Sequence, residues 1–260
     1  AVAACRRILD LNPDNIKALG YEGIALRRLE RYAEAIVPLE RARQLDPGVY
    51  STWSNLGTLY AVTGDLVRAE EYMRKGTELA GMAEDRWHAA AWRYLAALEL
   101  FLKKDEAMTH IGNAIQCYSA DSWSWVLRAR AQMELEGHLD LQGALDDAKH
   151  GDRIGKMADA KAKRVLALAH LRTGDFARAV QEAQQALQLG DEPSINHLVL
   201  ASAARGQGDS DTAAKALSAA QSIWPDPLRL VGGFMAGAGT GDLWIESADE
   251  RFELAKQAAE

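Results

Sequence analysis

Near its first quarter the chain reads Trp53-Ser54-Asn55-Leu56-Gly57-Thr58-Leu59-Tyr60. Gly57 in this segment is one of several residues that recur along the chain at a constant interval of 34 residues. Most of the recurring landmarks are small or turn-forming residues. They are Gly23 and Gly57, Ala35 and Ala69, Leu39 and Met73, Ala167 and Ala201, Gly174-Asp175 and Gly208-Asp209, Ala179 and Ala213, and Ala186 and Ala220. A fixed period of roughly 20–50 residues predicts a solenoid, whose stacked units share one core because none buries its apolar face alone.

The second copy of this unit resembles the tetratricopeptide repeat. It follows the pattern W-x2-L-G-x2-Y…A-x3-F of that family, with Met at the last position. The matching residues are Trp53, Leu56, Gly57, Tyr60, Ala69 and Met73. The resemblance implies two antiparallel helices per repeat, stacked into a right-handed superhelix with a concave groove. We therefore expect an all-α fold, an α-solenoid of helix hairpins.

The residue types in the unit agree with such hairpins. Gly57 on the first helix and Ala69 on the second are small where the two helices must approach closely. Gly64-Asp65 and its copies suit the turn between the helices, because Gly tolerates positive φ and Asp caps the following helix. The sequence thus predicts both the contact within a hairpin and the place where the chain turns.

Following this register divides the chain into six repeats of unequal quality. The first, second, fifth and sixth keep the spacing strictly. The third is degenerate and is one residue shorter than the regular spacing. The fourth is degenerate and carries a two-residue insertion near Leu139. The predicted repeats span 16–49, 50–83, 89–121, 122–157, 160–193 and 194–227.

The two flanks of the repeat array also carry a pattern. Residues 1–15 match the second helix of a truncated repeat, since Cys5 lies one full period before Leu39. Because the sequence opens on this half-repeat without an initiator Met, we expect it to be a fragment. Residues 228–242 are predicted to form a Gly-rich connector, and residues 243–260 a C-terminal capping helix with one polar face.

Composition narrows the class of function. The formal net charge of −7 argues against a general nucleic-acid binder, although it leaves room for a local basic surface. Cys5 and Cys117 lie far apart in the sequence without a motif around them, so no disulfide framework is expected. No apolar run approaches the ~18 residues that span a bilayer. We expect a soluble protein, with the cytoplasm favoured, and no cofactor.

The distribution of charge within the repeats is the main functional clue. In the resembled family the first helix of each hairpin lines the groove, and six of its residues face inward. In the four regular repeats, seven of these 24 positions hold Lys or Arg and none holds Asp or Glu, whereas chance placement of the 37 acids would put roughly three there. With those of the weaker repeats, the predicted binding residues are Lys17, Tyr21, Arg27, Arg28, Asn55, Arg93, Tyr94, Trp123, Arg130, Lys161, Arg164, Arg172 and Arg205.

A concave wall lined by cations attracts an acidic ligand and raises its encounter rate. Arginine dominates at these positions, and it suits bidentate contact with carboxylates. The sequence therefore predicts a non-enzymatic scaffold or adaptor whose groove binds an acidic peptide or protein segment. The alternative for the charges is that the arginines pair with acids on neighbouring helices and keep an open surface soluble.

Other binding and catalytic functions receive less support. A carboxylate clamp, as in one subfamily of the repeats, would need Lys and Asn at Gly20 and Ile24, so Asn55 stands without its companions. A groove for single-stranded RNA would need stacking aromatics at regular repeat positions. His138 and His150 lie among aspartates at no spacing typical of metal ligands, and no catalytic pairing is visible.

A structural role in assembly is the alternative function. The apolar edge of the half-repeat (Ala1, Cys5, Ile8) would support pairing with a second copy, giving a homo-oligomer, or packing against a preceding domain. The acidic segment 243–260 leaves another question open. It would either cap the stack or fold back into the groove.

Overall fold

The structure is a computed structural model, and it describes residues 1–155, 159–190, 193–223, 234–236 and 243–245. Thirteen α-helices, one 3-10 turn and two short strands lie in these ranges. The helices are α1 (Val2–Leu11), α2 (Ile16–Arg28), α3 (Tyr32–Leu45), α4 (Tyr50–Val62), α5 (Leu66–Ala80), α6 (Arg86–Phe101), α7 (Glu106–Cys117), α8 (Ser122–Glu134), α9 (Leu141–Ile154), α10 (Ala160–Arg172), α11 (Phe176–Gln188), α12 (Pro193–Gly206) and α13 (Ser210–Ile223). The 3-10 turn η1 is Glu136–His138, and the strands are β1 (Phe234–Ala236) and β2 (Leu243–Ile245).

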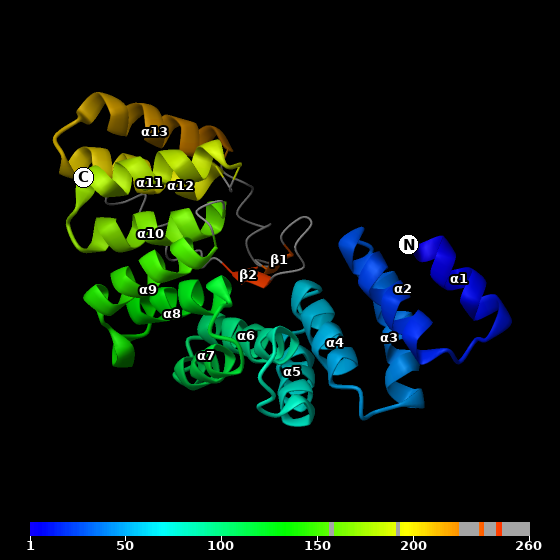
Figure 1. Ribbon diagram of the computed structural model, residues 1–260. Coiled ribbons are helices and arrows are strands. Elements are labelled where there is room, and N and C mark those ends of the chain that lie inside the picture. The colour runs from blue at the N-terminus through cyan, green and yellow to red at the C-terminus, as the bar shows by residue number, and fades with distance from the viewer. Residues whose placement is uncertain (156–158, 191–192, 224–233, 237–242, 246–260) are drawn as a thin grey trace.

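The helices stack as consecutive hairpins along a curved path, so that the molecule forms an arch from α1 to α13 (Figure 1). Within each hairpin the two helices contact each other, as α4 does with α5. The first helix of each hairpin also contacts the first helix of the next, from α2 through α12. These first helices form a continuous layer, which we call the inner wall: α2, α4, α6, α8, α10 and α12. The predicted helical solenoid is confirmed.

Three Gly-Asp pairs turn the chain between helices, as the sequence predicts. Gly64, Gly174 and Gly208 have φ angles of +89°, +80° and +81°, a region that strains residues with a side chain. Asp65 and Asp175 each accept a hydrogen bond from a backbone N–H of the following helix, at 3.1 Å and 3.2 Å. Glycine and carboxylate together fix where one helix ends and the next begins.

Two hairpins make the corresponding turn without glycine. Glu30, which lies one full period before Gly64, has a φ of 59°, and Lys103 has a φ of 55°. The left-handed backbone region costs a residue with a Cβ atom about 1 kcal/mol. The α2–α3 and α6–α7 turns therefore carry local backbone strain.

Small residues allow the two helices of a hairpin to approach closely. A Cβ atom on Gly57 would lie 2.6 Å from Met73 Cγ and 3.0 Å from the carbonyl oxygen of Ala69. A Cβ atom on Gly23 would collide with Leu39 in the same way. The predicted close contact between the first and second helices is confirmed at both places.

Alanine and leucine side chains dominate two buried clusters that run along the arch. One cluster extends from α2 to α8, and the other from α8 to α13. Helix α8 contributes to both, with Leu127 and Ala131 in the first cluster and Val126 and Ala129 in the second. The core is thus a strip with a seam at α8, as a solenoid requires.

The helix boundaries differ from the predicted repeats at two places. Helix α6 starts at Arg86, before the predicted start of the third repeat at 89, because Asp85 caps it and accepts hydrogen bonds from the N–H groups of Trp87 and His88 at 2.7 and 3.1 Å. Helix α12 starts at Pro193, inside the predicted fifth repeat, and proline is well suited to a first helical turn. The division of the chain into repeats stays a prediction.

The C-terminal part corrects another expectation. Leu243–Ile245 is the strand β2, not the first turn of a capping helix, and it pairs antiparallel with β1, Met235 opposite Trp244. The physical reason is local: apolar triplets flank a Gly-rich stretch, a pattern typical of a β-hairpin rather than a connector. The rest of the predicted capping helix, residues 246–260, lies outside the described residues.

Candidate functional site: the inner wall of the superhelix

One end of the inner wall presents cations and an aromatic ring to solvent. Lys17, Tyr21 and Arg28 lie on one face of α2, because separations of four and seven positions bring side chains to the same side of a helix. All three are exposed, and Tyr21 keeps 65% of its surface open. We call these three residues the α2 stripe.

In the middle of the wall the predicted arginines pair with acids. Arg93 Nε lies 3.1 Å from Asp121 Oδ2, and Arg130 pairs with Glu134 one turn along α8. Glu134 also accepts a hydrogen bond from Lys103 Nζ at 3.0 Å. Burial alone would raise the pKa of Glu134, but the neighbouring Arg130 and Lys103 hold it below its ordinary value. The acids thus neutralise part of the predicted basic surface.

The predicted aromatic and amide side chains also have neighbours. Lys161 Nζ lies 5.6 Å from the centre of the Trp123 ring, and the Arg93 guanidinium lies 5.3 Å from the Tyr94 ring, both within the range of cation–π attraction. Asn55 Nδ2 donates a hydrogen bond to a carbonyl oxygen of its own helix at 2.7 Å. The middle of the wall is therefore a set of internal contacts.

Burial further divides the predicted cations. Arg27, Arg130 and Arg164 are buried, Arg164 with only 1% of its surface exposed, and each interacts within the molecule. Arg172 is exposed and Arg205 half-buried, near the C-terminal ends of α10 and α12. The structure brings the predicted residues onto one layer of helices, but it leaves cations accessible mainly at the α2 end and at these two helix ends.

The β-hairpin lies against the middle of the inner wall. Strand β1 contacts α4, and strand β2 contacts α6 (Figure 1). These are the helices that carry Asn55, Arg93 and Tyr94. The described strands therefore agree with the alternative in which the C-terminal segment folds back onto the wall.

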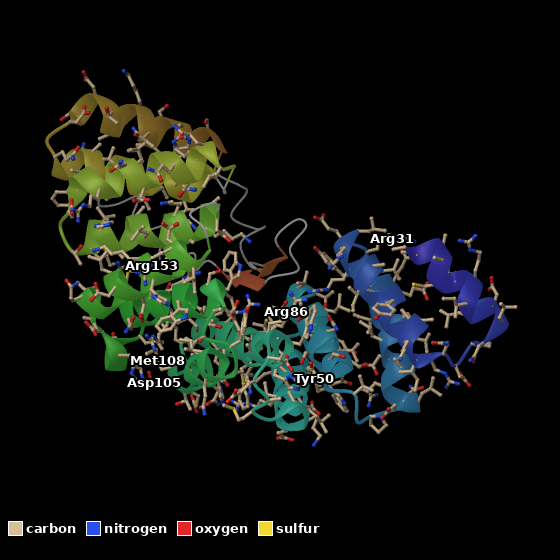
Figure 2. The ribbon with its side chains drawn as sticks, in the orientation of Figure 1. Arg31, Tyr50, Arg86, Asp105, Met108 and Arg153 are labelled. Carbon is tan, nitrogen blue, oxygen red and sulfur yellow. The ribbon has the colours of Figure 1, made fainter. Side chains whose placement is uncertain are left out.

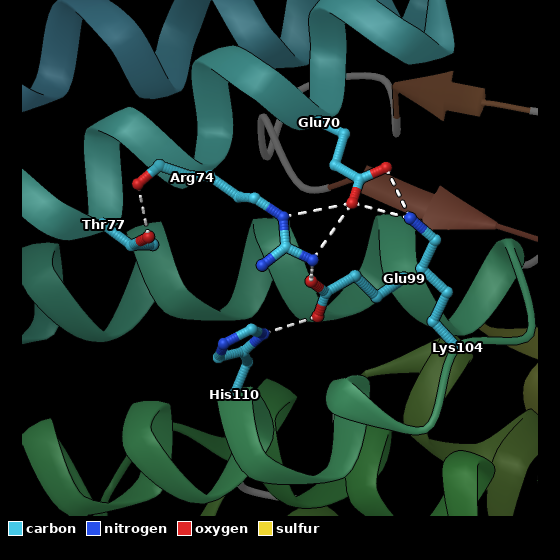
Figure 3. A network of polar contacts seen from close by, with 6 residues as sticks. All are labelled: Glu70, Arg74, Thr77, Glu99, Lys104 and His110. Atoms are coloured by element: carbon cyan, nitrogen blue, oxygen red, sulfur yellow. Dashed lines mark hydrogen bonds and ion pairs between the residues drawn. The ribbon is translucent and has the colours of Figure 1, made fainter.

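A polar network around the buried Glu99 joins the second and third hairpins (Figure 3). Glu99 of α6 is fully buried, and it accepts a hydrogen bond from Arg74 Nη2 of α5 at 2.7 Å and lies 2.5 Å from His110 Nδ1 of α7. Glu70 contacts Arg74 at 3.0 Å and Lys104 at 2.7 Å. Burial alone would raise the pKa of Glu70, but its bonds to Lys104 and Arg74 lower it. The network fixes α5, α6 and α7 to one another.

The histidines considered as metal ligands have other neighbours. His150 packs on Trp125, with ring centroids 4.3 Å apart, and His138 Nε2 lies 4.0 Å from Asp105 Oδ1. Within the described residues, no group of three His, Cys, Asp or Glu side chains is placed to hold a metal ion. In the same part of the chain, no helix combines the length and apolarity that crossing a bilayer requires.

The sequence analysis missed a group of charged residues on the outer side of the arch. Lys163 of α10, which is buried, has the position in the fifth repeat that Trp53 has in the second. Glu182 of α11 corresponds in the same way to Tyr72. An alignment of the repeats would have revealed this group, because charged residues of the fifth repeat stand at positions where the second repeat has aromatic residues.

These hairpins have counterparts among known proteins. A sequence model of the tetratricopeptide repeat matches residues 1–50, 22–83, 156–193 and 164–227, which together make up more than half of the chain. The chain belongs to the tetratricopeptide repeat family. Family and fold together support a protein-binding scaffold built from helical repeats.

Solved tetratricopeptide structures have the same fold at low sequence identity. The match to the APC/C hetero-tetramer Cut9–Hcn1 covers 98% of this chain and 45% of that chain, with a TM-score of 0.78 and 14% identity. PilF of Pseudomonas aeruginosa matches with 82% and 93% coverage, a TM-score of 0.66 and 18% identity. A tetratricopeptide repeat protein from Parabacteroides merdae matches with 100% and 91% coverage, a TM-score of 0.64 and 14% identity.

At these identities the likeness establishes the fold alone, and the chain spans less than half of the matched Cut9–Hcn1 chain. No curated protein sequence matches this chain significantly.

Proposed function

We propose that this tetratricopeptide protein is a non-enzymatic scaffold that binds an acidic segment of a partner protein on its inner wall, with the first contact at the α2 stripe. The observation that carries the proposal is the stripe itself, in which Tyr21, 65% exposed, lies between Lys17 and Arg28 on one helix face. Exposed aromatic rings beside cations are the side chains that anchor protein interfaces.

The chemistry of the stripe fits an acidic segment with an apolar residue. Arg28 offers two parallel N–H donors to a carboxylate, Lys17 adds a compact charge, and Tyr21 offers a ring for an apolar side chain. A single exposed ion pair contributes ~0–1 kcal/mol, so the ring and both cations must act together. An affinity near 1 μM, about −8 kcal/mol, suits a pre-formed open surface of this size.

The test is fluorescence anisotropy with a labelled ten-residue peptide that alternates acidic and leucine residues. We expect the double variant Lys17→Glu/Arg28→Glu to bind this probe at least tenfold more weakly, a change of ~1.4 kcal/mol. Added salt should weaken the binding by the unmodified chain, since exposed charges are screened beyond ~10 Å at 0.1 M.

The matched control reverses two exposed cations that lie outside the stripe, Arg7→Glu/Lys215→Glu, with the same change in net charge. Equal loss of binding in both double variants would mean that the probe senses only the total charge, and would reject the α2 stripe as a site. Binding to Tyr21→Ala separates the contribution of the ring from that of the charges.

Self-association through α1 is a second candidate function. The observation that favours it is the exposure of large apolar side chains on this helix, where Leu11 keeps 90% of its surface open and Ile8 is also exposed. Removing such surface from water would stabilise a complex by ~25 cal/mol per Å². The corresponding experiment is described in the Discussion.

A further inference from the structure

The outer side of the arch has a recurring site, where the first helix of one repeat meets its own second helix and the second helix of the preceding repeat. In the second repeat this site is filled by aromatic rings. The Tyr72 ring lies 5.1 Å from the Trp53 ring and 5.2 Å from the Tyr60 ring, measured between centroids. Arg43, from the preceding second helix, covers the Trp53 ring at 5.1 Å. Glu40, from the same preceding helix, accepts hydrogen bonds from the hydroxyls of Tyr60 and Tyr72 at 2.9 and 3.2 Å, so five side chains close this site.

The corresponding site of the fifth repeat has charged side chains instead of rings. When the repeats that start at 50 and 160 are aligned, Lys163, His170 and Glu182 stand at the positions of Trp53, Tyr60 and Tyr72. Asp152 of α9 provides the contact from the preceding second helix. Lys163 Nζ donates to Asp152 Oδ2 and to Glu182 Oε2, both at 2.9 Å. Burial alone would lower the pKa of Lys163, but its bonds to the two carboxylates raise it.

In the fifth repeat, where charged side chains stand in place of the rings, the site is an open cleft. A cleft of about 600 Å³ lies between α9, α10 and α11. Every residue that lines it except Leu166 has a polar side chain. Figure 2 labels Arg153 on this side of the arch. We call this cleft the outer cleft.

Two buried groups facing the outer cleft lack a hydrogen-bond partner. Asp152 Oδ1 accepts none, although its side chain is only 5% exposed. His170 Nδ1, in a side chain 3% exposed, makes no hydrogen bond either and lies 3.7 Å from Asp175 Oδ2. A buried polar atom left unpaired costs ~1–3 kcal/mol. Asp152 Oδ1 can only accept, so a group that satisfies it must be a hydrogen-bond donor.

The exposed edge of the cleft adds a second requirement. Lys149, Arg153 and Arg178 are exposed cations around it, with the exposed acid Asp146 among them and Asp175 3.4 Å from Arg178. Deeper inside, Asp152 and Glu182 are bound to Lys163. A ligand that satisfies both layers carries an anionic group for the edge and a donor for the interior. A peptide with an acidic side chain has both, since its backbone N–H is a donor. A fully deprotonated anion such as sulfate would meet the carboxylates without a donor of its own.

We propose that the outer cleft is a second peptide site, which takes an acidic segment of a protein partner. The acidic side chain contacts Lys149 and Arg178, and a backbone N–H donates to Asp152 Oδ1. The proposal does not depend on the α2 stripe, because the two sites lie on different helices and on different sides of the inner wall.

The test closes the cleft with side chains that this chain already uses. The variant Asp152→Arg/Lys163→Trp/His170→Tyr/Glu182→Tyr transplants the three rings and the arginine of the second repeat into the fifth. It is made in the Lys17→Glu/Arg28→Glu background, so that the outer cleft is read alone. The probe is the labelled acidic peptide described above. We expect at least a tenfold loss of affinity, although the substitutions make the chain more positive by two charges.

The increase in positive charge separates closure of a site from simple charge attraction. Unchanged or tighter binding by the folded transplant would overturn the outer cleft as a site, and so would the absence of binding in the Lys17→Glu/Arg28→Glu background. Circular dichroism checks that the helices remain.

If the transplant does not fold, the edge variant Lys149→Glu/Arg178→Glu decides, with Arg7→Glu/Lys215→Glu as its charge-matched control. If Lys17→Glu/Arg28→Glu abolishes binding of the probe and Lys149→Glu/Arg178→Glu does not change it, the outer cleft is rejected and the proposed function stands. If only Lys149→Glu/Arg178→Glu weakens binding, the outer cleft stands and the α2 stripe is rejected as the site.

Discussion

Glu30 carries backbone strain that Gly64, its counterpart in the next repeat, avoids. At a φ of 59° the relief from Glu30→Gly is about 1 kcal/mol, and the greater freedom of glycine in the unfolded chain offsets about 0.5 kcal/mol of it. We therefore expect this substitution to raise the free energy of unfolding by ~0.5 kcal/mol. Urea denaturation followed by circular dichroism measures the difference.

The reverse substitution is the natural control. Gly64→Glu places a side chain at a φ of +89° with open space around it, so the expected loss of ~1 kcal/mol comes from the backbone and not from a collision. If both substitutions change stability in the same direction, the strain at Glu30 is not what distinguishes the two turns.

Single residues also explain why the hairpins could be predicted from the sequence. Gly57 and Gly64-Asp65 meet local requirements, a close approach and a tight turn, which residue type alone satisfies. The inward-facing arginines are different, because the burial of Arg27 or Arg164 depends on tertiary packing and not on residue type. Helical register predicts the direction of such a side chain, but not its exposure.

The contacts that join helices α5, α6 and α7 depend on the carboxylate of Glu99, which is fully buried. Arg74→Ala removes one of the two partners of the buried Glu99 and leaves only His110 beside it, and we expect a loss of stability of ~3 kcal/mol. The double variant Arg74→Ala/Glu99→Leu removes the charge as well, and should regain much of the loss. A double-mutant cycle on the unfolding free energies measures the coupling between the two residues.

A matched pair on the surface provides the control for that cycle. Lys75 and Glu78, also on α5, are exposed and 3.0 Å apart, so Lys75→Ala/Glu78→Leu should show a coupling below ~1 kcal/mol. Equal coupling for the two pairs would contradict the view that burial gives Glu99 its importance.

Among the elements, regular helices were predictable and the exceptions have physical causes. The early start of α6 depends on the cap at Asp85, and a cap acts on one turn without disturbing the period of the repeats. The β-hairpin lies in a Gly-rich stretch where helical periodicity ends. The outer cleft was missed because its residues come from three helices, α9 to α11, and no contiguous motif joins them.

At the scale of the whole molecule, the exposed apolar side chains of α1, Ile8 and Leu11, would distinguish a monomer from an assembly. If α1 mediates self-association, light scattering coupled to size exclusion should give a dimer that persists at high salt, since apolar contacts are not screened. The double variant Ile8→Lys/Leu11→Lys should then be a monomer.

A pair of exposed valines is the control for this experiment. Val37→Lys/Val67→Lys adds the same charge to other exposed apolar positions, on α3 and α5. A dimer that dissociates in salt would instead indicate contact between the inner wall of one copy and an acidic surface of another. A monomer at both salt concentrations would remove self-association from consideration.

Helix α8 belongs to both buried clusters, and this gives the arch a mechanical pivot. Each repeat touches its neighbours, and packed side chains oppose bending within each cluster, so we expect the arch to bend mainly at α8, where one cluster ends and the other begins. A tilt of a few degrees about α8 would open neither cluster. Over the length of each arm it would nevertheless change the span between the α2 stripe and the outer cleft. A partner protein that binds the α2 stripe and the outer cleft at the same time would then fix the distance between them, and with it the curvature of the arch.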